Sequence, residues 1–213
     1  MTPFLVWAVS YLLGSIPFGI LFARKSNVDI RNHGSGNIGA TNVARVLGKK
    51  AGLLTLAGDV FKGLAAVAIA SRFLDHPWEI AVAGLMAFIG HVYSVFLKFK
   101  GGKGVATGLG IFLYLMPLAT VSSMAVFGVS LWASGYVSVG SILAALSIPL
   151  FGIYYQIPPE FIAVSVIVAL IVVSKHQGNL ERILAGTEAR FLKKIEFDKT
   201  RPENIMAEQE RSE

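Results

Sequence analysis

The sequence predicts an all-α, polytopic integral membrane protein. Of its 213 residues, 54% are hydrophobic and only 15% are charged, whereas soluble domains carry about 25% charged residues. The apolar residues form long runs, most of them near the roughly 20 residues that a membrane-spanning helix needs. The chain has no cysteine, which excludes thiol nucleophiles, thiolate metal sites and disulfides.

The apolar runs give the order of the expected helices. No basic segment precedes the first run, which favours a retained spanning helix over a cleaved signal peptide. The runs cover residues 3–23, 52–73, 79–97, 105–134, 137–155 and 160–174.

The fourth run, 105–134, is too long for one pass and short for two full passes. Pro117 lies near its middle, where a proline removes a backbone donor and interrupts a helix. We therefore expect two short helices that meet near Pro117, and seven transmembrane helices in total.

The distribution of Lys and Arg along the chain predicts which side of the membrane each connection faces. The segments 24–50 and 97–103 are rich in Lys and Arg, and the chain after residue 174 holds eight more, although eight acids balance them. The connections "DHPWE" and "QIPPE" are acidic or neutral. Basic loops stay in the cytoplasm, and all three basic segments share one side only if 105–134 crosses twice. The N-terminus is then outside and the C-terminus inside. The net charge of +6 is thus a topology signal, and no nucleic-acid partner is predicted.

The chain divides into a seven-helix membrane domain at residues 1–191 and a polar, highly charged cytoplasmic tail at 192–213. Such a composition is typical of a mobile, solvated segment.

The first polar cluster is "HGSGNIGATNVAR", residues 33–45. It contains G-x-G-x-x-G, but no strand precedes it, so a dinucleotide site is rejected. Its glycines let the backbone approach an anion, and a short helix over 40–47 would point free N–H groups at a phosphate. The alternative is a polar loop that caps a helix. The candidate phosphate-site residues are Gly34, Ser35, Gly36, Asn37, Thr41, Asn42 and Arg45.

The second cluster is "KFKGGKGVATG", residues 98–108, in which Lys103 is flanked by Gly101, Gly102 and Gly104. The spacing does not match a Walker loop. A lysine at a glycine-framed helix start is nonetheless a suitable point charge for a phosphate. The alternative is a lysine that snorkels to lipid headgroups while the glycines pack against a neighbouring helix.

The third cluster is "SKHQGNLERILAGTE", residues 174–188. His176 and Asn179 are three residues apart and would share one face of a helix that continues from the last span. Histidine suits proton transfer near neutral pH. The alternative is an interfacial histidine that caps the C-terminus of its helix.

Ionisable residues also occur inside the expected spans. Asp59 and Lys62 are three residues apart, and each costs about 3 kcal/mol to insert at a membrane centre. They are expected to neutralise one another as structural residues. His91 is expected to support the second cluster.

The three clusters are expected at one membrane face, where their cations and amides suit an anionic substrate with more than one phosphate. An enzyme, a phosphate or lipid-phosphate transporter, and a non-catalytic headgroup-binding protein all fit this arrangement. No carboxylate cluster suited to a metal ion is visible, so neither metal nor cofactor is predicted.

Four segments resemble the bacterial membrane-integral acyl-phosphate:glycerol-3-phosphate acyltransferase family, over about residues 3–191. They are "SYLLGSIPFG", "GSGNIGATNVAR", "GHVYSVFLKFKGGKGVATG" and "KHQGNLERILAGTE". The resemblance implies a multi-pass protein of the bacterial cytoplasmic (inner) membrane with its active site at the cytoplasmic face.

The activity that this resemblance implies is transfer of a fatty acyl group from acyl phosphate to the 1-hydroxyl of glycerol 3-phosphate. The products would be lysophosphatidic acid and phosphate, in the first step of phospholipid synthesis. Implied partners are the two substrates, membrane lipids and the upstream enzyme that forms acyl phosphate. Because an acyl phosphate is already activated, no covalent acyl-enzyme is expected.

The resemblance also assigns roles to residues. Ser35 and Arg45 would be essential at the substrate site, and Lys103 with its glycines would bind glycerol 3-phosphate. His176 and Asn179 would complete the catalytic centre, with either His176 or a substrate phosphate as the base. The remaining assignments are a structural role for Glu188 and a pocket-facing position for Ser138 and Ser141. Ser94 and Lys175 stand where the family usually has proline and arginine.

Overall fold

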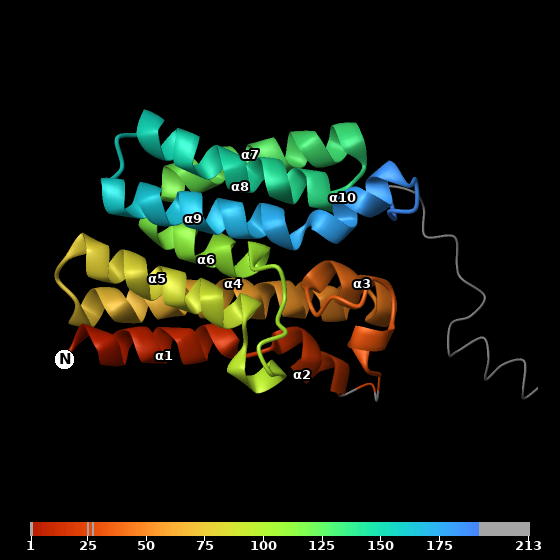
Figure 1. Ribbon diagram of the computed structural model, residues 1–213, viewed down its shortest axis with the longest axis horizontal. Coiled ribbons are helices and arrows are strands. Elements are labelled where there is room, and N and C mark those ends of the chain that lie inside the picture. Colours follow the sequence, from red (N-terminus) through yellow and green to blue (C-terminus); the bar gives the residue numbers. More distant parts are fainter. Residues whose placement is uncertain (1, 25, 27, 192–213) are drawn as a thin grey trace, which may run out of the picture.

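A computed structural model describes residues 2–24, 26 and 28–191 of the protein (Figure 1). These residues form α-helices and short 3-10 helices, which confirms the all-α prediction; the predicted tail at 192–213 lies outside them. The elements are α1 (Pro3–Ser15), α2 (Phe18–Arg24), η1 (Ile30–Asn32), α3 (Ala40–Leu47), α4 (Lys49–Phe73), α5 (Pro77–Val92), η2 (Val95–Leu97), α6 (Val105–Leu115), α7 (Pro117–Ser134), α8 (Val137–Tyr154), α9 (Pro159–Lys175) and α10 (Gln177–Leu184).

Several helices are long and apolar enough to cross a membrane. Among the described residues, five segments meet this condition by length and composition, and a sixth is the pair α9 and α10 if that bent pair is one span. The shorter apolar helix α6 has 11 residues. The protein is therefore an integral membrane protein with several spanning helices, while the count of seven and the orientation stay predictions.

The predicted interruption near Pro117 is confirmed. α6 ends at Leu115 and Pro117 is the first residue of α7, a position where the missing N–H of proline needs no partner. The expectation of two short helices is wrong for α7: α6 has 11 residues, whereas α7 extends over 18 residues.

Two further breaks were not expected. The first apolar run is divided at Ile16 and Pro17, between α1 and α2, because Pro17 has no N–H to continue the helical hydrogen bonds. The helix that was expected to continue past residue 174 is broken at His176: α9 ends at Lys175, and α10 departs from its axis by 46°.

α4 and α6 pack in very close contact, which fixes the end of the second polar cluster. A Cβ atom on Gly63 would overlap the carbonyl oxygen of Thr107, and one on Gly110 would overlap that of Val60. Small residues permit this approach of two membrane helices. α6, which follows Lys103, is therefore held against α4.

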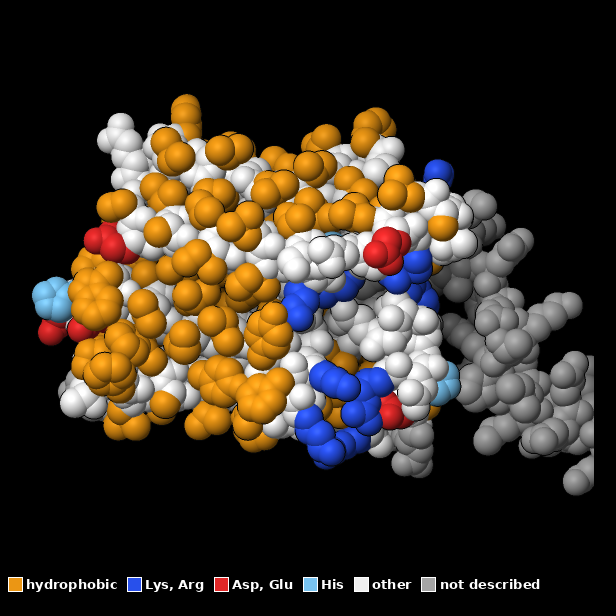
Figure 2. Space-filling model, viewed as in Figure 1, with side chains coloured by type: hydrophobic (Ala, Val, Ile, Leu, Met, Phe, Trp, Pro, Cys, Tyr) orange, Lys and Arg blue, Asp and Glu red, His pale blue; other side chains and the backbone are white. Residues whose placement is uncertain are grey.

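The polar segments gather at one end of the helical bundle. α2, α3, α10 and the loop before α6 lie toward the same end in Figure 1. On the face shown in Figure 2, Lys and Arg side chains collect at this end, and hydrophobic side chains cover the rest of the helices. The three clusters thus share one end of the molecule.

Candidate functional site

A direct contact joins the second and third polar clusters. Lys103, just before α6, donates a hydrogen bond from Nζ to Oδ1 of Asn179 in α10. Asn179 is buried, and Lys103 is half-buried. The close packing of α6 on α4 and the bend between α9 and α10 together bring these two side chains to one point.

Glu188 and Arg182 extend this contact into a chain of hydrogen bonds. Asn179 donates from Nδ2 to Oε1 of Glu188 at 2.6 Å, and Arg182 donates from Nε to Oε2 of the same carboxylate at 2.7 Å. The Glu188 side chain is only 11% exposed, so these are charge-assisted bonds in a partly dry site. Glu188 therefore holds the Asn179 amide in place.

Sequence reasoning missed Arg182. It follows Asn179 by three residues in α10, so both lie on one helical face. The three-residue spacing could have indicated that Arg182 lies beside Asn179. The sequence alone does not show that Glu188, beyond the end of α10, folds back to bond to both side chains.

The charges around Lys103 are mostly positive. Burial lowers the pKa of the Lys103 ammonium to about 8; the charge of Glu188 opposes this shift, and the charges of Arg182 and Arg45 add to it. The influence of Arg45 brings the first cluster into the electrostatic surroundings of the other two. Three cations with one carboxylate leave a surplus of positive charge, which suits a phosphate dianion.

The His176 ring has a defined orientation. It is buried, 3% exposed, at the break between α9 and α10. Its Nδ1 lies 2.7 Å from the carbonyl oxygen of Val172. Since a carbonyl only accepts, Nδ1 carries the hydrogen, and Nε2 of the neutral ring keeps a free lone pair. This contact fits the helix-capping alternative and also prepares Nε2 to accept a proton.

The predicted helix at 40–47 is present as α3 and presents part of the first cluster. Thr41 and Arg45 are exposed and four residues apart, hence on one helical face. Ser35 is exposed in the preceding loop. These three side chains are free to meet a ligand.

Asn42 holds the loop of the first cluster together. It is buried, and its Nδ2 donates to the carbonyl oxygens of Ile30, His33 and Asn37 at 3.3, 3.0 and 2.9 Å. Its Oδ1 accepts from the backbone N–H of Ser35 at 2.8 Å. The Asn42 donors are thus used to fold the loop, and its role at a phosphate stays a prediction.

Asn37 and the neighbouring glycines complete that loop. Asn37 accepts the N–H of Gly39 through Oδ1 at 2.9 Å, before the first turn of α3. Gly34 and Gly36 have positive φ angles, which L-residues with a Cβ rarely adopt. The loop is thus bent back on itself, and Ser35 lies at its exposed side.

The glycines around Lys103 also have structural contacts. The N–H groups of Gly101 and Gly102 donate to the carbonyl oxygens of Val92 and His91, both at 3.1 Å. These hydrogen bonds attach the loop to the end of α5, and the contact of Gly101 and Gly102 with phosphate stays a prediction. Gly104 has a φ of +84°, and a Cβ there would overlap the Phe88 ring.

Ser138 and Ser141 are both buried in the first turns of α8. The segment after Glu188 returns to this point, since the N–H of Phe191 donates to the carbonyl oxygen of Gly135 at 2.7 Å. Among the described residues no hydrogen bond joins either serine to Lys103 or Asn179, so their pocket-facing position stays a prediction.

The two departures from the family pattern have structural partners. The Ser94 hydroxyl donates to the carbonyl oxygen of Ser15 at 2.6 Å, which joins the end of α5 to the end of α1. Nζ of Lys175 lies 4.3 Å from the centroid of the Tyr93 ring, a cation–π distance.

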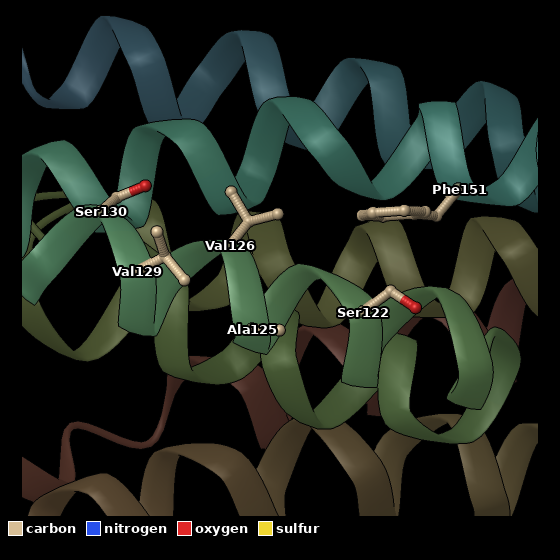
Figure 3. A pocket seen from close by; sticks show the side chains of 6 residues that line it. All are labelled: Ser122, Ala125, Val126, Val129, Ser130 and Phe151. Atoms are coloured by element: carbon tan, nitrogen blue, oxygen red, sulfur yellow. The ribbon is translucent and has the colours of Figure 1, made fainter.

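The hollow shown in Figure 3 lies apart from this site. It is a groove along α7 and α8 with a largely apolar lining, and none of the predicted site residues borders it. In the described part of the chain, no three carboxylate or histidine side chains are grouped as metal ligands. The residues that line the groove along α7 and α8 are Ser122, Ala125, Val126, Val129, Ser130 and Phe151.

Comparison with known proteins gives one consistent result. The family model described as glycerol-3-phosphate acyltransferase matches residues 4–186. The glycerol-3-phosphate acyltransferase of Geobacter sulfurreducens is 50% identical over 186 residues, which cover 86% of this chain and 95% of that protein. That of Trichlorobacter lovleyi is 50% identical over 193 residues, covering 90% and 99%.

Solved structures agree with these relatives. The crystal structure of PlsY (YgiH), an integral membrane glycerol 3-phosphate acyltransferase, in its glycerol 3-phosphate form is 39% identical, with a TM-score of 0.86 over 90% of this chain and 96% of that chain. Its lysophosphatidic acid form gives a TM-score of 0.82 over 89% and 95%. The chain described here belongs to the glycerol-3-phosphate acyltransferase family of integral membrane proteins.

Proposed function

We propose that this protein transfers a fatty acyl group from acyl phosphate to the 1-hydroxyl of glycerol 3-phosphate. The products are lysophosphatidic acid and inorganic phosphate, in the first step of phospholipid synthesis. Family membership supports the acceptor, and the similar PlsY structures are of a glycerol 3-phosphate form and a lysophosphatidic acid form.

The hydrogen bond from Lys103 to Asn179 carries this proposal. It places a cation and a polarised amide together at one end of the bundle, within the electrostatic influence of Arg45. A reaction between two phosphate-bearing substrates needs this combination of charge and orientation. A transporter would place such groups near the membrane midplane, so the position favours the enzyme.

The choice of donor rests on chemistry. In an acyl phosphate the acyl carbon is already activated and phosphate is a good leaving group, so the acceptor hydroxyl attacks it directly. One bond forms between the glycerol oxygen and the acyl carbon, and the bond from that carbon to the phosphate oxygen breaks. The chain has no cysteine, and direct transfer requires no enzyme nucleophile. Lys103 and Arg45 hold phosphate groups, and Asn179 with Ser35 stabilises the developing negative charge.

The proton of the glycerol hydroxyl has two possible acceptors. Nε2 of His176 has a free lone pair, because Nδ1 is bonded to the Val172 carbonyl. A phosphate oxygen of a substrate is the other acceptor. Either route gives the same products.

The proposed location is the bacterial cytoplasmic membrane, with seven spans, the N-terminus outside and the active site facing the cytosol. The gathering of the basic segments at one end of the bundle supports this orientation (Figure 2). The enzyme that forms acyl phosphate would act immediately upstream.

The test is product identification with two donors. Purified protein in detergent receives glycerol 3-phosphate with either palmitoyl phosphate or palmitoyl-CoA, and lysophosphatidic acid is quantified by mass spectrometry. The proposal expects product from palmitoyl phosphate alone. Product only from palmitoyl-CoA would overturn the donor, and no product from either would overturn the activity.

A further inference from the structure

A buried cluster of ionisable side chains lies between the polar end and the apolar core. On α4, Nζ of Lys62 is 2.8 Å from Oδ1 of Asp59, and both side chains are 3% exposed. Nδ1 of His91, on α5, lies 3.6 Å from the same carboxylate oxygen. Apolar residues would fill this space at lower cost, because buried ion pairs contribute little net stability.

Lys62 connects this cluster to the loop of the first polar cluster. Its Nζ donates to the carbonyl oxygen of Ile16 at 2.7 Å, at the break between α1 and α2. α2, which starts there, lies against the first loop: a Cβ on Gly19 would overlap the carbonyl oxygen of Ile38. Lys62 therefore fixes the starting point of the helix on which the Ser35 loop packs.

His91 connects the cluster to the loop of Lys103. The carbonyl oxygen of His91 accepts the N–H of Gly102 at 3.1 Å. The ring is equally close, since a Cβ on Gly102 would overlap Nε2 of His91. A shift of the His91 ring would consequently displace the residue next to Lys103.

We propose that Asp59, Lys62 and His91 act as positioning residues that set the distance between the Ser35–Arg45 segment and the Lys103 loop. The cluster thereby sets the separation at which the two substrate phosphates are held. This inference rests on the proposed function, because it assumes that both loops bind phosphate. None of the three side chains needs to touch substrate.

The first experiment separates positioning from simple charge neutralisation. Asp59→Asn and Lys62→Met are made singly and together, with Ser71→Ala as control, because Ser71 is on α4 and, among the described residues, its hydroxyl bonds only to Val67 of the same helix. Each single change leaves an unpaired buried charge and should lower thermal stability. The double change removes both charges and should recover that stability.

Positioning predicts that the stable double variant still has kcat/KM for glycerol 3-phosphate reduced about 10- to 100-fold, and binds glycerol 3-phosphate more weakly in equilibrium dialysis. Ser71→Ala should match the wild type in both. A double variant with normal stability, normal kinetics and normal binding would overturn the proposal.

A second experiment holds even if the double variant does not fold. Gly102→Ala is combined with His91→Ala, which makes room for the new Cβ. Positioning through the His91 ring predicts that Gly102→Ala weakens glycerol 3-phosphate binding more in the wild-type background than beside His91→Ala. Equal losses in both backgrounds would contradict it. If the wild type itself neither binds glycerol 3-phosphate nor transfers an acyl group, the proposed function fails instead.

Discussion

Asn179 donates from Nδ2 to Oε1 of Glu188 at 2.6 Å, and this bond decides which way the Asn179 amide faces. A carboxylate only accepts hydrogen bonds, so the amide nitrogen must lie toward Glu188 and the amide oxygen toward Lys103. Arg182 holds the second carboxylate oxygen. Each of the three hydrogen bonds from Arg182 to Lys103 therefore pairs a donor with an acceptor.

Substitutions that exchange the donor on Asn179 and the acceptor on Glu188 test whether this bond orients the Asn179 amide. Asn179→Asp places two carboxylates against each other, and kcat/KM is expected to fall about 100-fold. Addition of Glu188→Gln restores a donor between them and should recover at least about tenfold of that loss. Steady-state kinetics of the two single variants and the double variant measure the effect. A double variant no better than Asn179→Asp would show that the contact does not orient the amide.

Arg182 is expected to matter although it need not touch substrate. Arg182→Ala removes the bond to Oε2 of Glu188 and leaves a carboxylate that is 11% exposed without its charged donor, so kcat/KM should fall about tenfold. Arg190→Ala is the matched control, because Arg190 is exposed and contacts Tyr136 instead. Equal effects of the two substitutions would indicate a general charge effect.

The activity is expected to decline at alkaline pH. The pKa of Lys103 is lowered to about 8 from 10.5, chiefly by burial. The ammonium that binds phosphate is therefore present below pH 8 and lost above it. The contribution of Lys103 to folding stability has the opposite pH dependence. Between these two pKa values the unfolded chain binds more protons than the folded chain, so the free energy of unfolding rises with pH.

A pH series of KM for glycerol 3-phosphate measures this effect, with a correction for spontaneous hydrolysis of the acyl phosphate. KM should rise above pH 8 in the wild type. In Lys103→Arg the guanidinium stays charged, so the rise should be absent even if the basal rate is lower. The same alkaline rise in both proteins would assign the titration to another group.

His176 distinguishes the two routes for the proton. If Nε2 is the base, His176→Gln should lower kcat about 100-fold or more while glycerol 3-phosphate binding changes little. A decrease of less than about tenfold would favour a substrate phosphate as the base and leave His176 as the cap of α9. Equilibrium dialysis beside the kinetic assay separates lost chemistry from lost binding.

The close contact of α4 and α6 is expected to limit stability. Gly110→Ala places a Cβ on the carbonyl oxygen of Val60 and should lower the thermal midpoint by several degrees, as about 1–3 kcal/mol of overpacking does. Gly128→Ala in α7 has open space around its Cβ and serves as control. A thermal midpoint for Gly110→Ala no lower than that of the control would show that α4 and α6 can separate.

Features set by local chemistry could be predicted from the sequence. Proline fixed the α6–α7 break at Pro117, and the change from a glycine-rich loop to a helical pattern located α3. The burial of Asn42, the bend at His176 and the place of Arg182 depend on contacts with residues elsewhere in the chain. A list of donors in a loop does not show which of them the fold already uses, as the hydrogen bonds of Asn42 within its own loop illustrate.

One assay tests both the proposed phosphate-binding role of Lys103 and the proposal that acyl phosphate is the donor. Phosphate release from palmitoyl phosphate is followed for the wild type and Lys103→Ala, each with and without glycerol 3-phosphate. Release by the wild type is expected only when both substrates are present, and Lys103→Ala should be slower by roughly 30- to 1000-fold, or about 2–4 kcal/mol of transition-state stabilisation. Release that does not require glycerol 3-phosphate, or a near-normal rate in Lys103→Ala, would contradict the account.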